Sequence, residues 1–217
     1  MNNYLDNIML LTDSYKHSHW KQYPKGTEYV RSYFEARDGA KFDETLFFGL
    51  QYYLEQYCMG YVITKQKIDE AEDVITKHMG QHFNRAGWEY ILDKHHGRLP
   101  VEIRAVPEGT LVPTSNVMMT VENTDPNCPW LTNFLETLLV NVWYPCVVAT
   151  QSHEMRKVIQ HYLDLTGDDA VDFKLHDFGV RGVTCPEQAA IGGAAHMVNF
   201  KGTDNLPSIM LCRRFYK

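Results

Sequence analysis

The sequence lacks the features that mark nucleic-acid-binding, membrane and secreted proteins. Its 21 Lys and Arg are outnumbered by 27 Asp and Glu, and the formal net charge of -6 excludes a broad basic surface for nucleic acid. The most apolar segment, "LLVNVWYPCVVA", is interrupted by Asn141 and Pro145 well short of a membrane span. The N-terminal "MNNYLDNIMLL" has no basic region of the kind that opens a secretory signal. We therefore expect a cytoplasmic protein that acts on small molecules.

Metal-binding and redox motifs are missing as well. The five cysteines are odd in number and widely spaced, without a CxxC pair, and we interpret them as reduced thiols. Three close pairs of histidines have no HExxH pattern and no cysteine partner, so surface or hydrogen-bonded histidines are favoured over metal ligands. These pairs are His17 with His19, His78 with His82, and His95 with His96.

What is present is the composition of an ordinary globular protein, with 44% hydrophobic and 22% charged residues. A length of 217 residues suits one large domain or two small ones. Helical spacing of apolar residues predicts several helices, and alternation predicts short strands separated by the turns "PEGT" and "PTSN". The predicted helices cover about 43–59, 64–79, 84–97, 130–138 and 146–163, and the strands lie within 101–123. The first part of the chain is therefore predicted to be α+β.

From Val171 the pattern changes to strand, helix, strand, helix. A helix is predicted from Thr184, "VNF" is a short strand, and Pro207 opens the last helix. Thr184 and Glu187 have the spacing of a capping box, and Pro186 falls in the first turn, where its missing N–H costs nothing. Such an order predicts two parallel strands.

Polar residues follow both of these strands, in "HDFGVRG" and "KGTD". Parallel strands end at the same edge, so Phe178 and Asp204 are expected near one planar ligand. Phe178 offers an aromatic face, Asp204 accepts hydrogen bonds from an amide or amine, and Arg181 suits a phosphate or carboxylate. The residues alone leave two alternatives open. In the first, Phe178 only fills the core. In the second, His176, Asp177 and Arg181 form a structural ion cluster.

The triplet "DFG" also occurs in protein kinases. No Gly-rich loop, V-A-I-K strand or H-R-D loop precedes it here, so a kinase is excluded. The small residues of "GGAAH" lie inside a predicted helix rather than between a strand and a helix, so they are no dinucleotide fingerprint. We interpret them as allowing close helix packing.

Seven blocks of sequence, taken in order, carry a resemblance to a known family. They are "TDSYKHSHWKQYP", "FFGLQYYL", "AVPEG", "VENTDP", "WYPCVVAT", "KLHDFGVRG" and "VNFKGTD". Together they resemble the nicotinamide phosphoribosyltransferase family over nearly the whole chain. The resemblance implies an α/β protein: an N-terminal α+β domain over 1–145, followed at 146–217 by the first β-α units of an incomplete type II phosphoribosyltransferase barrel.

The resemblance also implies a reaction of NAD salvage. Nicotinamide attacks the anomeric carbon of phosphoribosyl diphosphate, which forms nicotinamide mononucleotide and releases diphosphate. Mg²⁺ accompanies the phosphoribosyl diphosphate and is not held by residues identifiable in this chain. The full-length enzyme is expected to be a homodimer with shared active sites.

The family's nicotinamide site maps onto four residues of this sequence. Phe178 is expected to form one face of a nicotinamide sandwich, and Tyr15 of the second subunit is expected to form the other, with Asp13 nearby. Asp204 is expected to bind the carboxamide, because a nicotinate carboxylate there would meet like charge. The alternatives are a core tyrosine for Tyr15 and a helix cap for Asp204.

The resemblance also assigns roles to two arginines, and the sequence differs from the family pattern in two respects. Arg181 is expected beside the ring and the phosphoribosyl group, and Arg37 at a phosphate across the dimer, with a solvated loop arginine as the alternative for Arg37. Val180 stands where the family often has Tyr. The larger departure is length, because the sequence stops at "LCRRFYK", before such a barrel closes.

The family's catalytic histidine, its "RPDSG"-like segment and its glycine-rich phosphate loop have no counterpart in the sequence, so no catalytic residue is assigned. We expect the isolated chain to be inactive. Three alternatives remain open: one half of a split enzyme that needs a second polypeptide, a non-catalytic nicotinamide-binding or dimerisation remnant, and a piece of a full-length enzyme.

Overall fold

The structure is a computed structural model that describes residues 5–216, and it divides into two compact units. One unit, the sheet unit, contains residues 5–34, 53–105 and 119–140. The other, the helical unit, contains residues 35–52, 106–118 and 141–216. Each unit is therefore assembled from three separate stretches of chain. The predicted boundary at residue 145, between an N-terminal α+β domain and the first part of a barrel, stays a prediction.

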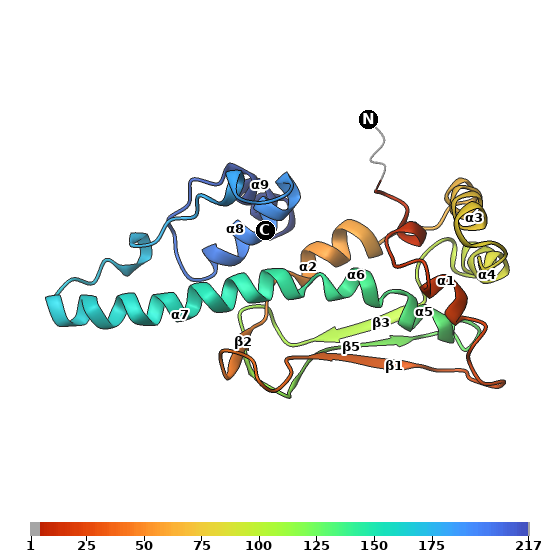
Figure 1. The fold of residues 1–217 in the computed structure, drawn as a ribbon, viewed down its shortest axis with the longest axis horizontal. Coiled ribbons are helices and arrows are strands. Elements are labelled where there is room, and N and C mark those ends of the chain that lie inside the picture. Colours follow the sequence, from red (N-terminus) through yellow and green to blue (C-terminus); the bar gives the residue numbers. More distant parts are fainter. Residues whose placement is uncertain (1–4, 217) are drawn as a thin grey trace. The chain divides into compact units, whose positions relative to one another are not determined.

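The sheet unit is built on three strands in the order β1-β5-β3, visible side by side in Figure 1. They are β1 (Arg31–Glu35), β5 (Val117–Asn123) and β3 (Val101–Ala105). β3 and β5 run antiparallel, with Val101 opposite Asn123 and Ala105 opposite Met119. The strands predicted within 101–123 are confirmed, and "PEGT" and "PTSN" lie beside β4 (Leu111–Pro113).

Helices of the sheet unit follow their capping signals. In α3 (Lys65–Met79), the Thr64 side chain accepts a hydrogen bond from the Lys67 amide at 3.3 Å, and Gly80 ends the helix with a positive φ. In α4 (Arg85–His95), Asn84 caps the first turn. The helices predicted over 64–79 and 84–97 are thus confirmed. The other helical segments are η1 (Ile8–Leu10), α1 (Lys16–His19), η2 (Leu54–Cys58), α5 (Pro129–Phe134) and α6 (Glu136–Val140).

An aromatic cluster forms part of the core of the sheet unit. Trp88 of α4 is almost fully buried, and its ring lies 4.7 Å from Trp130 and 5.0 Å from Phe134, edge to face in both cases. His17 of α1 is buried beside Phe134 at 5.2 Å. The histidine is therefore a core residue rather than a metal ligand.

The helical unit is organised by α7 (Trp143–Thr166), the long helix of Figure 1, against which α8 (Pro186–Met197) packs. α9 (Leu206–Phe215) packs on α8. A two-stranded antiparallel pair, β2 (Glu44–Leu46) with β4, contacts α7 through the Leu46 amide, which donates to Thr150 Oγ1 at 2.9 Å. The remaining segments are α2 (Leu50–Tyr53), which runs into the sheet unit at its last residue, η3 (Val171–Phe173) and η4 (Gly179–Arg181).

The helix predicted over 43–59 is wrong at its start. Residues 44–46 pair with β4, and the helix begins only at Leu50, after Gly49 with φ +104. A side chain at Gly49 would come within 2.5 Å of Pro145, which fixes glycine there. The apolar spacing that suggested a longer helix instead reflects burial of Leu46, Phe47 and Phe48.

The two strands predicted after residue 171 do not form regular ladders. Residues 171–173 are a 3-10 turn, and "VNF" follows the end of α8. The two segments nevertheless run parallel, because the Lys201 amide donates to the Asp172 carbonyl at 2.8 Å and Asp177 and Thr203 form a parallel bridge. The predicted direction is therefore confirmed, while regular strands are not formed.

The predicted start of the next helix is corrected by one residue. Cys185, rather than Thr184, is the N-cap of α8, with Pro186 in the first turn as predicted. The Thr184 hydroxyl donates to Gln188 Oε1 at 2.8 Å, and Glu187 Oε1 accepts a hydrogen bond from the Tyr52 hydroxyl. The capping box therefore does not form.

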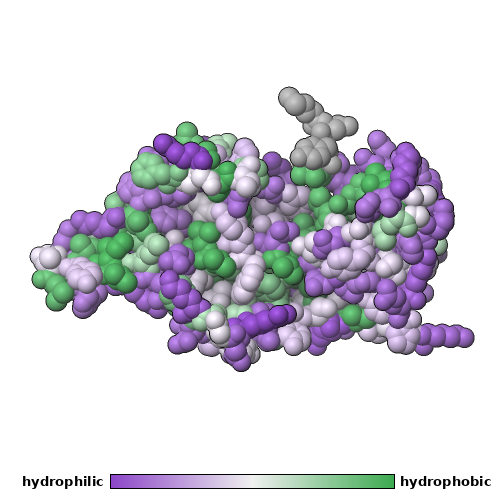
Figure 2. Space-filling view, viewed as in Figure 1, coloured by the Kyte–Doolittle hydropathy of each residue, from purple (hydrophilic) through white to green (hydrophobic). Residues whose placement is uncertain are grey.

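The second half of α7 exposes an apolar stripe, defined by Met155, Val158, Tyr162 and Leu165. Figure 2 shows apolar patches at that end of the molecule. Among residues 5–216, no single helix is long and apolar enough to cross a membrane, and only the bent pair Pro129–Val140 and Trp143–Thr166 reaches that length and apolarity together.

Candidate functional site

The candidate site lies where two loops of the helical unit run side by side. One loop follows η3 and carries residues 175–183, and the other follows α8 and carries residues 201–205. The Asp204 amide donates to the Asp177 carbonyl at 3.0 Å, next to the parallel bridge between Asp177 and Thr203. The predicted convergence of "HDFG" and "KGTD" is thus present in the structure.

Three side chains form the exposed face of this site. The His176 and Phe178 rings are stacked, with centroids 6.3 Å apart and an interplanar angle of 24°. His176 Nδ1 lies 3.6 Å from Asp204 Oδ2. Phe178 is 60% exposed and the Asp204 side chain 56%, so an aromatic face and a carboxylate are both accessible to solvent. Phe178 does not fill the core.

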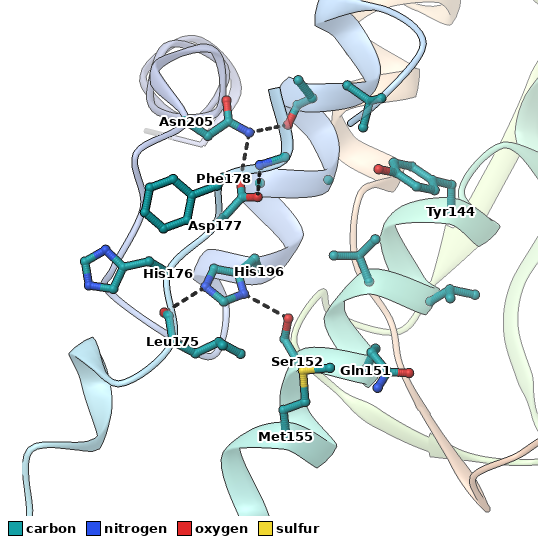
Figure 3. A pocket seen from close by; sticks show the side chains of 17 residues that line it. Tyr144, Gln151, Ser152, Met155, Leu175, His176, Asp177, Phe178, His196 and Asn205 are labelled. Carbon is teal, nitrogen blue, oxygen red and sulfur yellow. Dashed lines mark hydrogen bonds between the residues drawn. The ribbon is translucent and has the colours of Figure 1, made fainter. Parts of the chain in front are cut away.

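A clamp lies behind this face, formed by the half-buried Asp177 and the fully buried Asn205 (Figure 3). The Asn205 side-chain amide donates to Asp177 Oδ2 and to the Ala189 carbonyl of α8, both at 2.8 Å. The other carboxylate oxygen of Asp177 accepts from the Gly179 amide at 2.8 Å. Asp177 therefore pairs with amides, and the alternative of an ion cluster with Arg181 is not what the structure shows.

The glycines of α8 let the clamp approach the helix. A Cβ on Gly193 would lie 2.5 Å from Asn205 Nδ2 and 2.6 Å from Asp177 Oδ2. A Cβ on Gly192 would lie 2.5 Å from the Tyr144 hydroxyl of α7. The reading of "GGAAH" as a close-packing segment is confirmed.

A second buried tie holds the start of the first loop. His196 of α8 lies with Nδ1 3.0 Å from Ser152 Oγ and with Nε2 3.2 Å from the Leu175 carbonyl oxygen. The His196 ring stacks on Phe200 at 5.0 Å. Because a neutral imidazole donates from one nitrogen and accepts at the other, this arrangement satisfies both. The loop is fixed at Leu175 and again at Asp177.

A cavity of about 300 Å³ lies between α7, α8 and the first loop. Figure 3 shows Tyr144, Gln151, Ser152 and Met155 entering it from α7. Burial, with a smaller contribution from the Asp177 carboxylate, raises the pKa of Tyr144. The hydroxyl therefore stays neutral at physiological pH, in a cavity with mostly apolar walls.

The other predicted site residues are placed as follows. Arg181 is exposed in η4, and Arg37 is exposed in the loop after β1. Asp13 and Tyr15 belong to the sheet unit, where Asp13 accepts from Thr137 Oγ1 at 3.3 Å and Tyr15 is 53% exposed, so Tyr15 is not a core tyrosine. The structure therefore brings the segments of Phe178 and Asp204 together. The expected roles of Asp13, Tyr15, Arg37 and Arg181 stay predictions.

Two further residues of the site, Asn205 and His196, were not predicted from the sequence. Asn205, and not Asp204, caps α9, because its side-chain oxygen accepts from the Ser208 amide at 3.2 Å. The signal was the spacing of Asn205 before Pro207, with Asn at the N-cap and Pro in the first turn. His196 gave no signal, since one histidine on an apolar helix face is typical of a hydrogen-bonded core residue.

No metal site is apparent in the described part of the chain. Among residues 5–216, no three His, Cys, Asp or Glu side chains are grouped so that they could hold a metal ion.

Comparison with known proteins identifies relatives of this chain. Residues 7–103 match the family model for the nicotinamide phosphoribosyltransferase N-terminal domain, and residues 173–213 match that for the nicotinate phosphoribosyltransferase family. A nicotinamide phosphoribosyltransferase of Xanthomonas campestris pv. campestris is 50% identical over 216 residues, which are 98% of this chain and 46% of the relative. Another, from Acinetobacter baylyi, is 30% identical over 94% of this chain and 44% of its own length.

A solved structure is similar in fold. The crystal structure of human nicotinic acid phosphoribosyltransferase matches 93% of this chain and 37% of its own chain, with a TM-score of 0.65 and 19% identity. The chain thus has the mixed helix and strand fold of the type II phosphoribosyltransferases. It spans about half the length of the curated relatives it matches. We conclude that the chain belongs to the nicotinamide phosphoribosyltransferase family and matches the N-terminal half of its members.

Proposed function

We propose that this chain supplies the nicotinamide-binding part of a cytoplasmic nicotinamide phosphoribosyltransferase. The ring nitrogen of nicotinamide attacks the anomeric carbon of phosphoribosyl diphosphate, the bond to diphosphate breaks, and nicotinamide mononucleotide forms. The observation that carries the proposal is the exposed pair of Phe178 and Asp204, joined through His176 at the meeting of two parallel segments.

The chemistry of this pair suits a carboxamide on a flat ring. The face of Phe178 stacks on the pyridine ring, and the Asp204 carboxylate accepts from the amide N–H. A carboxylate in place of the amide would be repelled by Asp204, at a cost of up to about 4 kcal/mol at 4 Å and an effective dielectric constant of 20. The site therefore favours nicotinamide over nicotinate.

The remaining predicted residues complete the proposed site in a homodimer. Tyr15 of a second subunit covers the other face of the ring, with Asp13 beside it. Arg181 carries positive charge toward the phosphoribosyl group, and Arg37 contacts a phosphate across the dimer. Tyr15, Arg37 and Arg181 are all exposed in the single chain, which supports their use by an external ligand or subunit.

Catalysis in such a displacement rests on positioning and on charge stabilisation, because the transition state has oxocarbenium character. Mg²⁺ enters with phosphoribosyl diphosphate as part of the substrate. We propose that the catalytic groups lie in the half of the relatives that this chain does not match, and that the isolated chain does not turn over. A second polypeptide carrying that half would restore activity.

The test is formation of nicotinamide mononucleotide from nicotinamide, phosphoribosyl diphosphate and Mg²⁺. The purified chain is assayed alone and together with the unmatched half of the Xanthomonas relative. Product only in the mixture supports the proposal, whereas product from the chain alone contradicts the need for a second half. Nicotinamide binding without product in either sample would favour a non-catalytic binding or dimerisation remnant.

Two variants separate the proposed site from general effects on the chain. Phe178→Ala and Asp204→Asn are expected to weaken nicotinamide binding, measured by saturation-transfer NMR on the chain. Asp164→Asn, an exposed change on α7, serves as the control. Unchanged binding in both site variants would place the nicotinamide site elsewhere.

A further inference from the structure

The exposed side chains of the candidate site are held mainly through their backbone. Phe178 and Asp204 are each more than half exposed, so packing of their own side chains fixes them weakly. Their neighbours in sequence are held firmly, since Asp177 precedes Phe178 and Asn205 follows Asp204. The geometry of the exposed pair therefore depends on the clamp of Asp177 and Asn205.

The bonds of the clamp shape the first loop and join it to the second. The bond from the Gly179 amide to Asp177 Oδ1 closes a turn around Phe178, and the bond from the Asp204 amide to the Asp177 carbonyl joins the loops. Asn205 completes the set by holding Asp177 Oδ2 at 2.8 Å. One fully buried amide thus links the aromatic face to the carboxylate.

Asn205 also ties the clamp to two helices. Its amide nitrogen bonds the Ala189 carbonyl of α8, and its oxygen caps α9 at Ser208. The Gly193 backbone leaves no room for a Cβ beside it. A side chain with both a donor and an acceptor in this place satisfies three contacts at once, which serine, alanine and aspartate do not.

We propose that Asn205 is a positioning residue that sets the preference of the site for a carboxamide over a carboxylate. It does so through Asp177, by fixing the separation of Phe178 and Asp204. This inference rests on the proposed function of the Phe178 and Asp204 pair. Asn205 itself lies behind the exposed face and touches no part of the proposed ligand.

The test uses the full chain with Asn205→Ser. Serine keeps an oxygen for the cap of α9 and removes both donated bonds. Asn199→Ala is the matched control, because Asn199 is a buried asparagine of the same unit whose side chain bonds α7, at 2.9 Å to the Ala149 carbonyl and 3.2 Å to His153 Nδ1, instead of the clamp. Two readouts are measured on each variant: hydrogen exchange of backbone amides by NMR, and binding of nicotinamide and of nicotinate.

In Asn205→Ser, the amides of Gly179 and Asp204 are expected to lose protection from exchange while those in the middle of α8 keep it. The Kd for nicotinamide is expected to rise roughly tenfold, as for loss of a hydrogen bond to a charged group, and the preference over nicotinate to fall by a similar factor. Asn199→Ala is expected to change neither binding value more than about twofold.

Three results would be decisive. Normal protection of Gly179 and Asp204 in Asn205→Ser would overturn the clamp, whatever the chain binds. Lost protection with an unchanged preference for nicotinamide would overturn the positioning role. Lost protection in a chain whose unaltered form binds no nicotinamide would contradict the proposed function of the site, and with it the specificity role, while leaving the clamp itself in place.

Discussion

Ser152 of α7 and His196 of α8 meet in the interior of the helical unit, with 3.0 Å between the hydroxyl oxygen and Nδ1. The imidazole is only 6% exposed and its other nitrogen reaches the Leu175 carbonyl. The pair therefore connects two helices to the loop that carries the candidate site.

Ser152→Ala is expected to destabilise the chain by about 1–3 kcal/mol, because it leaves a buried imidazole nitrogen without its partner. The free energy of unfolding is measured in urea. Ser32→Ala, at an exposed position of β1, is the control and is expected to stay within about 0.5 kcal/mol of the parent. Equal effects of the two changes would show that the Ser152 contact contributes nothing to stability.

Because of His17, we expect the free energy of unfolding to fall on acidification. Burial lowers the pKa of His17 to about 4, against an opposing contribution from the Met9 carbonyl. The folded state therefore binds this proton less readily than the unfolded chain, whose histidine titrates near 6.5. The contribution of neutral His17 is complete above pH 6.5 and is lost as the pH falls toward 4, by at most about 3 kcal/mol.

The measurement is urea unfolding at several pH values between 7.5 and 4. His17→Gln should flatten the dependence over this range, while His161→Gln, at an exposed position of α7, should leave it as in the parent. A parent chain whose unfolding free energy does not change between pH 6.5 and 4 would contradict the burial effect.

Gly193→Ala is expected to destabilise the chain although alanine favours helices more than glycine. The added methyl group would press on Asn205, Asp177 and Ser208, with 2.7 Å to the Cβ of Ser208. Overpacking of this kind costs about 1–3 kcal/mol, with a fall in Tm of about 2–4 °C per kcal/mol. Gly182→Ala is the control, because its nearest atom lies at 3.7 Å, and a Tm equal to that of the parent for Gly193→Ala would refute the tight packing.

The cysteines are expected to fall into two classes of reactivity. Burial raises the pKa of Cys58, Cys128 and Cys146 to about 12, so their thiolate populations at pH 8 are very small. Cys185 is exposed at the start of α8. Iodoacetamide at pH 8, followed by mass spectrometry, should label Cys185 first, and all five thiols in guanidinium. Early labelling of Cys146 would contradict its burial.

Much of the secondary structure followed from local signals. Thr64, Asn84 and the glycines after their helices fixed α3 and α4, because capping groups act within one turn. β2 escaped prediction because its partner β4 lies more than 60 residues away and its apolar residues also fit a helix. Pairing over such a distance overrides local periodicity.

The candidate site was predicted only in part, because strand direction can be inferred from the sequence and contacts between distant side chains cannot. Phe178 and Asp204 follow from strand direction, which β-α order dictates, and the structure brings their segments together. The clamp behind them did not follow, because the bond from Asn205 to Asp177 joins residues 28 positions apart and depends on the absence of a side chain at Gly193. Close approach of this kind appears only once the helices are packed.

The exposed apolar stripe on α7 is expected to affect how long this polypeptide persists in a cell. Met155, Val158, Tyr162 and Leu165 present to solvent the kind of surface that chaperones hold and that leads to degradation when it stays uncovered. Abundance of the chain is therefore expected to depend on how much of that surface is shielded, as well as on how fast the chain is made. Turnover by quality control would limit how much of this protein persists without a shielding partner.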